Sequence, residues 1–296
     1  MRMHTDEVHI DVSLVRRLLA AQFPQWADLR IEPVPSAGTV NAIYRLGDDM
    51  TVRLPRVQRY VRDLEKEYDW LPKLAPHLPL AIPERLAIGD PGEGYEWRWC
   101  VYRWLKGEIW DTDRVRDLSE AAVDLAQFIT ALRRIDTAGA PRRPAGYETL
   151  TRHEYVRPAI AAARGLIDMD AVHAAWDAAL KLPAWSGPMV WVHGDLSRPG
   201  NLLVAGGRLS AVIDFGSISL GDPARELMAA WTLFSGESRA AFRYALAVDD
   251  ATWARGRAWT LTRVMNVAYY AKTNPAIVAE ARHAIEEVLA DHRSTA

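Results

Sequence analysis

The first third of the chain shows one helical pattern followed by several strand patterns. Apolar residues at positions 14, 15, 18, 19 and 23 recur at helical spacing and predict an amphipathic helix. Turn residues then separate three short apolar segments, which predict strands at 31–35, 42–46 and 50–54. The short connections between these strands favour an antiparallel sheet.

The pattern then changes to a charged helix before it returns to strands. Residues 61–75 carry Leu64, Leu71 and Leu74 on one side and predict a helix, whose last turn contains Pro72. Two further strand patterns, at 86–88 and 97–105, are joined by a Gly- and Pro-containing turn. The sequence up to residue 105 therefore predicts a small sheet accompanied by helices.

Helical spacing dominates the chain after residue 107. Ser119 begins a strong helical pattern, a further helix opens at Pro223 and ends near Phe234, and the other predicted helices span 154–165, 168–181, 238–247, 251–272 and 276–291. Short apolar runs at 189–192, 202–204 and 211–213 form a small β insert among these helices. We therefore expect an α+β protein with two lobes, 1–105 and 106–296.

Composition and charge exclude several classes of protein. The chain has 296 residues, 49% hydrophobic and 25% charged, which is typical of a globular protein. Because 36 Lys+Arg stand against 38 Asp+Glu, it has no general basic surface for a nucleic acid. No apolar run approaches the ~18 residues of a membrane-spanning helix. The single cysteine, Cys100, favours a reducing, cytoplasmic location and is expected to be a buried hydrophobic residue.

The segment 193–201, with the sequence HGDLSRPGN, and the IDFG segment at 213–216 carry the most informative chemistry. Asp195, Asn201 and Asp214 each lie next to a short apolar strand that can aim them. One carboxylate can orient an attacking hydroxyl and accept its proton, while an amide oxygen and a second carboxylate suit Mg²⁺. This set predicts phosphoryl transfer. The alternative is that these residues only satisfy turn backbone, which Asp and Asn often do.

These motifs resemble the catalytic and metal-binding loops of the aminoglycoside phosphotransferase family, which are small-molecule kinases with the protein-kinase fold. The resemblance covers nearly the whole chain and implies a protein-kinase-like bilobal fold, with an N-terminal antiparallel sheet and a mainly helical C-terminal lobe. It places Asp195 at the catalytic aspartate, Asn201 and Asp214 at the metal ligands, and His193 at the residue that supports the loop. The kinase pattern has one residue fewer between the aspartate and the asparagine. Arg198, in this longer loop, would reach toward the γ-phosphate.

The resemblance also implies a phosphate-binding cation in the N-terminal lobe. Kinases use a strand lysine paired with a helix glutamate, but this chain has no lysine before Lys66. Arg53 takes that position by resemblance, and its planar fork can bond carboxylate and phosphate bidentately. Glu67 is the predicted partner, with Glu65 as the alternative. An ordinary surface arginine is the competing interpretation of Arg53.

The turn 36–41, with the sequence SAGTVN, lies where the family covers the triphosphate of the nucleotide. Gly38 lets the backbone approach closely, and its neighbours, Ser36 and Thr39 among them, offer N–H groups. A plain hairpin turn explains this segment equally well.

The strand before residue 105 leads into the segment that would bind the purine ring. The resemblance implies that Val101, Tyr102 and Trp104 lie beside the adenine or guanine ring and that backbone groups supply the hydrogen bonds. Backbone recognition leaves no side-chain signature, so both ATP and GTP remain open, with Mg²⁺ as the accompanying ion.

The acceptor is expected to bind between the catalytic loop and the helices after residue 223. Glu226 either supports the catalytic loop or faces solvent, and Asp222 is predicted to cap the following helix. Carboxylates that could hold a cationic sugar are more often surface residues, and aromatic residues that could form the walls of the acceptor site are more often core residues. The candidates of both kinds are Glu108, Asp111, Asp113, Glu226, Glu237, Trp231, Trp253, Trp259, Tyr269 and Tyr270.

The resemblance implies a small-molecule O-phosphotransferase that moves the γ-phosphate of ATP or GTP to a hydroxyl of an antibiotic, with an aminoglycoside as the first expectation. The alternatives are a macrolide kinase, a kinase of a metabolite such as choline, homoserine or a sugar, and a nucleotide-binding pseudokinase scaffold. We expect a hydroxylated small-molecule acceptor, no nucleic-acid or membrane partner, and a monomer or weak dimer.

Overall fold

The computed structural model describes residues 7–35, 40–141 and 153–295. Contacts within the chain divide it into two compact units, of which the first consists of Met1–Glu108 with Ser210–Ser217 and the second of Ile109–Leu209 with Ile218–Ala296. Two backbone hydrogen bonds tie the inserted segment to the first unit, because Ala81 N–H donates to the Ser210 carbonyl and its own carbonyl accepts from Val212 N–H. The first unit thus receives a segment from the last third of the chain.

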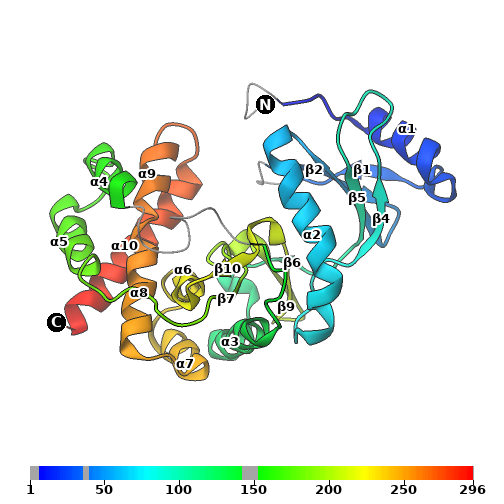
Figure 1. The fold of residues 1–296 in the computed structure, drawn as a ribbon. Helices are drawn as coiled ribbons and strands as arrows, with labels where there is room; N and C mark the ends of the chain where they lie inside the picture. The colour runs from blue at the N-terminus through cyan, green and yellow to red at the C-terminus, as the bar shows by residue number, and fades with distance from the viewer. Residues whose placement is uncertain (1–6, 36–39, 142–152, 296) are drawn as a thin grey trace. The chain divides into compact units, whose positions relative to one another are not determined.

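A five-stranded antiparallel sheet forms the centre of the first unit (Figure 1). Its order is β1-β2-β3-β5-β4, and all the strands predicted for this region are present. The strands are β1 (Ile31–Pro33), β2 (Asn41–Leu46), β3 (Met50–Pro55), β4 (Arg85–Gly89) and β5 (Trp99–Arg103). Strand β3 is paired on both sides, so its residues lie in the middle of the sheet.

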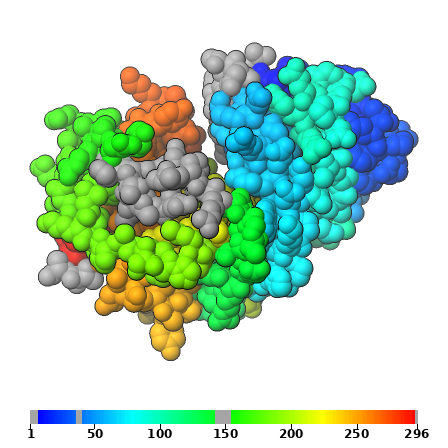
Figure 2. Space-filling view, viewed as in Figure 1, coloured from blue at the N-terminus to red at the C-terminus, as the bar shows by residue number. Residues whose placement is uncertain are grey.

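Helix α1 (Val12–Gln22) covers part of this sheet with the apolar stripe that the sequence predicts. The carboxylate of Asp11 caps it by accepting the Leu14 N–H at 2.8 Å. Figure 2 shows the residues of α1 (dark blue) directly beside those of β4 and β5 (turquoise). The shared core contains Leu14, Val15, Leu18, Leu19, Ile31, Leu46, Val52 and Trp99.

Helix α2 (Val61–Leu74) is the second helix of this unit, and it brings a charged residue into the core. The helix continues through Pro72 to Leu74, where the 3₁₀ turn η3 (Ala75–His77) follows. Its buried side contains Leu64, Leu71 and, unusually, Glu67. An acidic side chain on the apolar face of a helix requires a partner inside the protein.

The second unit is mainly helical, as the spacing of its apolar residues predicts. Helix α9 packs against α4 and α10, and α3 packs against α7. The helices are α3 (Leu118–Arg134), α4 (His153–Ala162), α5 (Met169–Ala179), α6 (Ala229–Thr232), α7 (Gly236–Leu246), α8 (Asp250–Leu261), α9 (Val264–Tyr270) and α10 (Pro275–Thr295).

Two of the predicted helices are wrong in detail. The helix expected over 251–272 is two helices, because the chain leaves helical bonding at Thr262, whose hydroxyl donates to the Trp259 carbonyl at 2.6 Å. The helix expected from Pro223 begins as the 3₁₀ helix η8 (Pro223–Met228) and becomes α-helical only in α6. Side chains on both segments bond to the loop described below.

Short strands frame the segments that carry the predicted chemistry. Strand β7 (Val190–Val192) pairs antiparallel with β10 (Ser219–Gly221). A three-stranded sheet has the order β6-β8-β9, formed by β6 (Glu108–Ile109), β8 (Leu202–Ala205) and β9 (Arg208–Val212). The sequence missed β6 and β10, which are too short to show a pattern. Residues 193–201 thus connect β7 to β8, and Asp214 follows β9.

None of the helices in the described part of the chain combines the length and the apolarity that a bilayer crossing requires.

Candidate active site

Arg53 and Glu67 form an ion pair inside the first unit. Arg53 lies in the middle of β3, opposite Ile43 on β2 and Cys100 on β5. Its Nη1 lies 2.8 Å from Glu67 Oε2, and the two side chains are 12% and 1% exposed. Glu67, not Glu65, is therefore the partner, because only Glu67 lies on the buried side of α2. Because this pair is buried, Arg53 is not an ordinary surface arginine.

Two further groups bind the Glu67 carboxylate. The Tyr102 hydroxyl donates to Oε2 at 3.2 Å, and the Phe215 backbone N–H also bonds to the carboxylate. Burial raises the pKa of Glu67, while Arg53 and these two hydrogen bonds oppose the shift. Burial by itself would lower the pKa of Arg53, but the neighbouring Glu67, Tyr102 and Asp214 raise it above its ordinary value. Arg53 therefore stays cationic.

Asp214 lies in the same cluster and has an unusual backbone. Its φ of 65° is in the left-handed region, which Asp tolerates better than most residues. Its Oδ1 lies 3.8 Å from Arg53 Nη2, so one guanidinium faces both Glu67 and Asp214. The Asp214 side chain is 42% exposed, which leaves it accessible to a ligand.

Helix α2 also holds the residues that follow Asp214, which form the 3₁₀ turn η7 (Phe215–Ser217). Lys66 Nζ donates to the Gly216 carbonyl and forms an ion pair with Asp63 at 2.9 Å. A Cβ at Gly216 would lie 3.2 Å from Asp63 Cβ, so this turn approaches the helix closely. Asp63 and Lys66 of α2 thus contact the turn that directly follows Asp214.

The second unit holds the loop between β7 and β8, which begins with two anchored residues. His193 is fully buried, and its Nδ1 accepts the Asp195 N–H at 3.3 Å. Gly194 has a φ of 80°, a conformation that glycine adopts readily. Its N–H donates to Glu226 Oε1 at 2.8 Å, and its carbonyl accepts from Arg225 Nη2 at 2.9 Å. Of the two roles left open for Glu226, the structure supports the one that holds the loop.

Asp195 and Asn201 are brought together at the far end of this loop. Asn201 Nδ2 donates to the Asp195 carbonyl at 3.0 Å and to its Oδ2 at 3.1 Å. The extra residue of the loop is absorbed by two turns, in which Arg198 N–H donates to the Asp195 carbonyl and Asn201 N–H to the Arg198 carbonyl. Arg198 Nη1 lies 3.9 Å from Asp195 Oδ2, with its side chain 41% exposed. The longer loop therefore still presents its carboxylate and amide side by side.

Buried charges behind the loop complete this cluster. Asp222 caps η8 by accepting the Ala224 N–H at 2.9 Å, as predicted, and it also forms a buried ion pair with Arg255 at 3.0 Å. Burial raises the pKa of Glu226, opposed chiefly by its hydrogen bond from Gly194. Sequence reasoning found Asp222 by its position before Pro223, but it had no signal for Arg255.

Asn201 in the second unit and Asp214 in the first each carry an oxygen donor of the kind that Mg²⁺ takes. The Asn201 amide nitrogen is used by Asp195, so the amide oxygen is the atom left to act as a ligand. Mg²⁺ in phosphoryl-transfer enzymes is usually held by one or two carboxylates together with substrate phosphates. A group of three or more His, Cys, Asp or Glu side chains suited to a metal does not occur among the residues described. Each donor, taken by itself, has the chemistry that Mg²⁺ accepts, and their role as metal ligands stays a prediction.

The remaining predicted residues fall into three groups. Ser36, Gly38 and Thr39 lie outside the described residues. Val101 and Tyr102 lie inside β5, paired with β3 on one side and β4 on the other, and the Trp104 N–H donates to the Asp49 carbonyl. Their role beside the purine stays a prediction, and the structure shows a side-chain role for Tyr102 that the sequence did not indicate.

Most of the candidate acceptor residues have other environments. Glu226 is buried against Gly194, and the side chains of Trp231, Trp253 and Trp259 belong to the core. Asp111 caps the 3₁₀ turn η4 (Thr112–Arg114). Exposed side chains are found at Glu108, Asp113, Glu237 and Tyr269, the last in ring contact with Tyr270.

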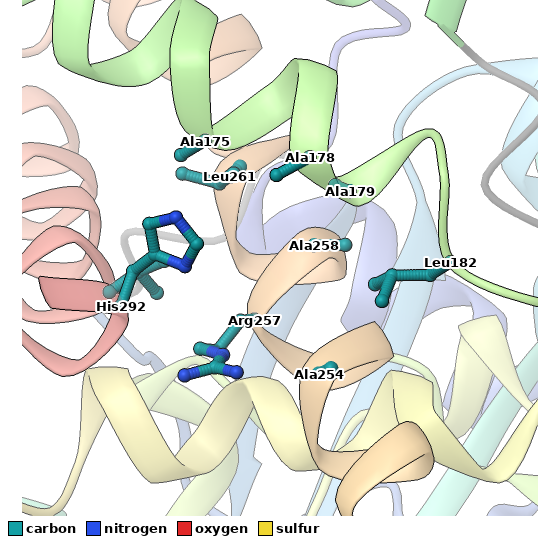
Figure 3. A pocket seen from close by; sticks show the side chains of 10 residues that line it. Ala175, Ala178, Ala179, Leu182, Ala254, Arg257, Ala258, Leu261 and His292 are labelled. Atoms are coloured by element: carbon teal, nitrogen blue, oxygen red, sulfur yellow. The ribbon is translucent and has the colours of Figure 1, made fainter. Parts of the chain in front are cut away.

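A small cavity in the second unit does not belong to this site. It lies between α5, α8 and α10 and has a volume of about 60 Å³ (Figure 3). Alanine side chains line much of it, together with Arg257 and His292. Sites for small molecules usually have about 300–1,000 Å³, so this cavity cannot hold a nucleotide or an antibiotic.

Comparison with known proteins gives a consistent family and fold. The profile of the phosphotransferase enzyme family matches residues 31–259. A search of curated protein sequences found no match. The solved GDP complex of wild-type aminoglycoside 2'-phosphotransferase-IIIa is 19% identical, with a TM-score of 0.73 over 96% of this chain and 100% of that chain.

Two further solved structures extend the comparison. The GDP and kanamycin complex of APH(2")-IIIa is 20% identical, with a TM-score of 0.74 over 94% of this chain and 98% of that one. The macrolide 2'-phosphotransferase MphH from Brachybacterium faecium is 22% identical, with a TM-score of 0.61 over 93% and 98%. At such identities the likeness shows the fold, and it confirms the predicted kinase-like α+β architecture.

Proposed function

Because the chain belongs to the phosphotransferase enzyme family, we propose that it transfers the γ-phosphate of ATP or GTP to a hydroxyl group of a small-molecule antibiotic, with an aminoglycoside as the first acceptor to test. The observation that carries this proposal is the pair of Asp195 and Asn201, held side by side by hydrogen bonds in a loop anchored at Gly194. A loop that only closed a turn would not need a part-exposed carboxylate fixed in this way.

Asp195 accepts the hydrogen bond of the acceptor hydroxyl and takes its proton as the acceptor oxygen attacks the γ-phosphorus. The bond between the γ-phosphorus and the bridging oxygen breaks, and the nucleoside diphosphate leaves. Arg53 binds phosphate oxygens through its guanidinium fork. Asn201 and Asp214 would hold Mg²⁺, which neutralises charge on the phosphates when it is bound. In this proposal Arg198, whose Nη1 lies 3.9 Å from Asp195 Oδ2, contacts the transferred group.

The acceptor class rests on the solved relatives, whose names include aminoglycoside and macrolide phosphotransferases. An aminoglycoside is favoured because the structures with the larger TM-scores carry that name. A macrolide is the second candidate, since MphH has the higher sequence identity. Transfer to either would protect a cell, so expression of the chain should raise the inhibitory concentration of the modified antibiotic.

The test is a transfer assay on the purified protein with ATP or GTP and Mg²⁺. Panels of aminoglycosides, macrolides and hydroxylated metabolites such as choline, homoserine and sugars are followed by ³¹P NMR and mass spectrometry. Phosphorylation of an antibiotic supports the proposal. Phosphorylation of a metabolite alone overturns the acceptor class, and nucleotide binding without transfer to any acceptor supports the scaffold alternative.

A further inference from the structure

Arg263 is a buried cation without an ion-pair partner among the described residues. Its side chain is 5% exposed, and its Nη2 donates to the Ser197 carbonyl at 2.8 Å and to the Ser197 hydroxyl at 2.6 Å. Its Nε is buried and makes no hydrogen bond. The other buried arginine of this region, Arg255, does have a carboxylate partner in Asp222. Burial of an unpaired charge is costly, so the position of Arg263 calls for a function.

The position of Arg263 in the chain allows this contact. It lies between α8 and α9, in the break that interrupts the helix predicted from the sequence. Residues on a continuous helix would project at fixed intervals along its surface. At this break, Arg263 donates to Ser197, which lies 66 residues earlier in the chain.

Ser197 is part of the lengthened loop between Asp195 and Asn201. The beginning of this loop is held at Gly194 by Arg225 and Glu226. Arg263 holds it again at Ser197, so that Asp195 lies between two anchoring points. The second anchor falls within the stretch that is one residue longer than the kinase pattern, where the backbone would otherwise have the most freedom.

The charge of Arg263 also acts on this loop. Burial lowers the pKa of Arg263, and the attraction of Asp195 opposes that shift, so the two side chains interact electrostatically. Arg198 also faces Asp195, at 3.9 Å. The loop therefore has a cation that is partly exposed and one that is fixed in the interior.

We propose that Arg263 is a positioning residue, which fixes the lengthened catalytic loop through Ser197 and provides a permanent positive charge behind Asp195. The proposal rests on the proposed function for its effect on turnover. Its effect on the loop itself follows from the hydrogen bonds and does not depend on the identity of the acceptor.

The test compares Arg263→Met, Arg263→Gln and Arg263→Lys in the full chain. Arg257→Met is the matched control, since Arg257 lies on α8 (Figure 3) and pairs with Asp291 on α10. We expect Arg263→Met to lower kcat about 100-fold, the size of effect that misplacement of a reacting group can have, with the KM for the nucleotide nearly unchanged. Arg263→Gln keeps a hydrogen-bond donor but loses the charge, so its kcat should be at least about 10-fold lower than that of Arg263→Lys.

Hydrogen exchange of the peptide covering 194–201 gives a readout that does not require turnover. We expect faster exchange in Arg263→Met than in Arg257→Met, and a smaller increase in Arg263→Lys, which also serves if the methionine variant fails to fold. Unchanged loop exchange together with a kcat within about threefold of the wild type would overturn the proposal. An inactive wild-type protein whose loop still loosens in Arg263→Met would count against the proposed function but support the positioning role.

Discussion

The two clusters of functional residues are held by different kinds of bond. In the first unit, Arg53, Glu67 and Asp214 meet side chain to side chain, and the first two lie on a strand and a helix. In the second unit, Glu226, Arg225 and Arg263 bond to main-chain atoms of a loop. The first cluster therefore depends on balanced charges on rigid elements. The second depends on the path of a backbone, which its neighbours hold in place.

The largest effect is expected at the loop, from Asp195→Asn. A general base or orienting group contributes about 10²- to 10⁴-fold to turnover, so kcat should fall by that factor while nucleotide affinity, measured by calorimetry, is kept. The variant still offers an oxygen to Asn201. Asp168→Asn, at the exposed N-cap of α5, is the control and should change neither value. Turnover close to the wild type in Asp195→Asn would remove this residue from its proposed role.

The charge cluster can be broken by Arg53→Met, which leaves Glu67 buried without its cation. Removing one partner of a buried pair costs about 3–5 kcal/mol of unfolding free energy, measured by urea unfolding followed through tryptophan fluorescence. The double variant Arg53→Met/Glu67→Leu should recover most of this loss, because an apolar pair can replace a buried ion pair.

The exposed pair of Arg103 and Glu84, at 2.6 Å, provides the matched control for that experiment. Arg103→Met should cost less than about 1 kcal/mol, because solvent screens such a pair. Equal losses in Arg53→Met and Arg103→Met would show that the first cluster does not depend on its buried charges.

Tyr102→Phe sharpens the same comparison with a smaller change. The lost hydrogen bond goes to the Glu67 carboxylate, and bonds to charged groups contribute about 1.5–3 kcal/mol. Tyr95→Phe removes a bond of 2.8 Å to the neutral carbonyl of Pro55 and should cost about 0.5–1.5 kcal/mol. A loss at Tyr95 that matches or exceeds the one at Tyr102 would contradict the role given to the Glu67 charge.

The smallest effect is expected at Cys100, opposite Arg53 in the sheet. Burial raises the pKa of the Cys100 thiol to about 12, so the folded protein should resist alkylation by iodoacetamide at pH 8.5, and urea should expose the thiol. Only the unfolded chain releases the proton above an ordinary thiol pKa of about 8.5, so this group makes stability fall as the pH rises from there toward 12. Rapid alkylation in native buffer would show that this part of the sheet opens readily.

Residues fixed by periodic patterns could be predicted from the sequence. Strand and helix patterns put Arg53 on a strand and Glu67 on a helix, and the resemblance to the kinase family then gave these two residues, Asp195 and Asn201 their expected roles. The choice between Glu67 and Glu65 needed the orientation of α2 against the sheet, which spacing alone does not supply. The extra residue in the loop was visible in the sequence, but the two turns that absorb it were not.

The cationic side chains that support these groups could not be predicted. Arg263 bonds to a residue 66 positions away, Arg225 to one 31 positions away, and Lys66 to one 150 positions away. In each case an acceptor is a backbone carbonyl, and every residue has one, so the partner leaves no mark in the sequence. The chain has 31 arginines among its 36 basic residues, and pattern alone does not distinguish the few that are buried.

The inserted segment Ser210–Ser217 has a consequence for recombination between relatives. A gene fusion that exchanged everything up to Glu108 for the corresponding part of another enzyme would join a foreign helix and sheet to the native Asp214 turn. Arg53, Lys66 and Glu67 would then be replaced while their partners at 214–216 remained. Such a chimaera should fail unless the short segment is exchanged too, so these two distant stretches are expected to be inherited together.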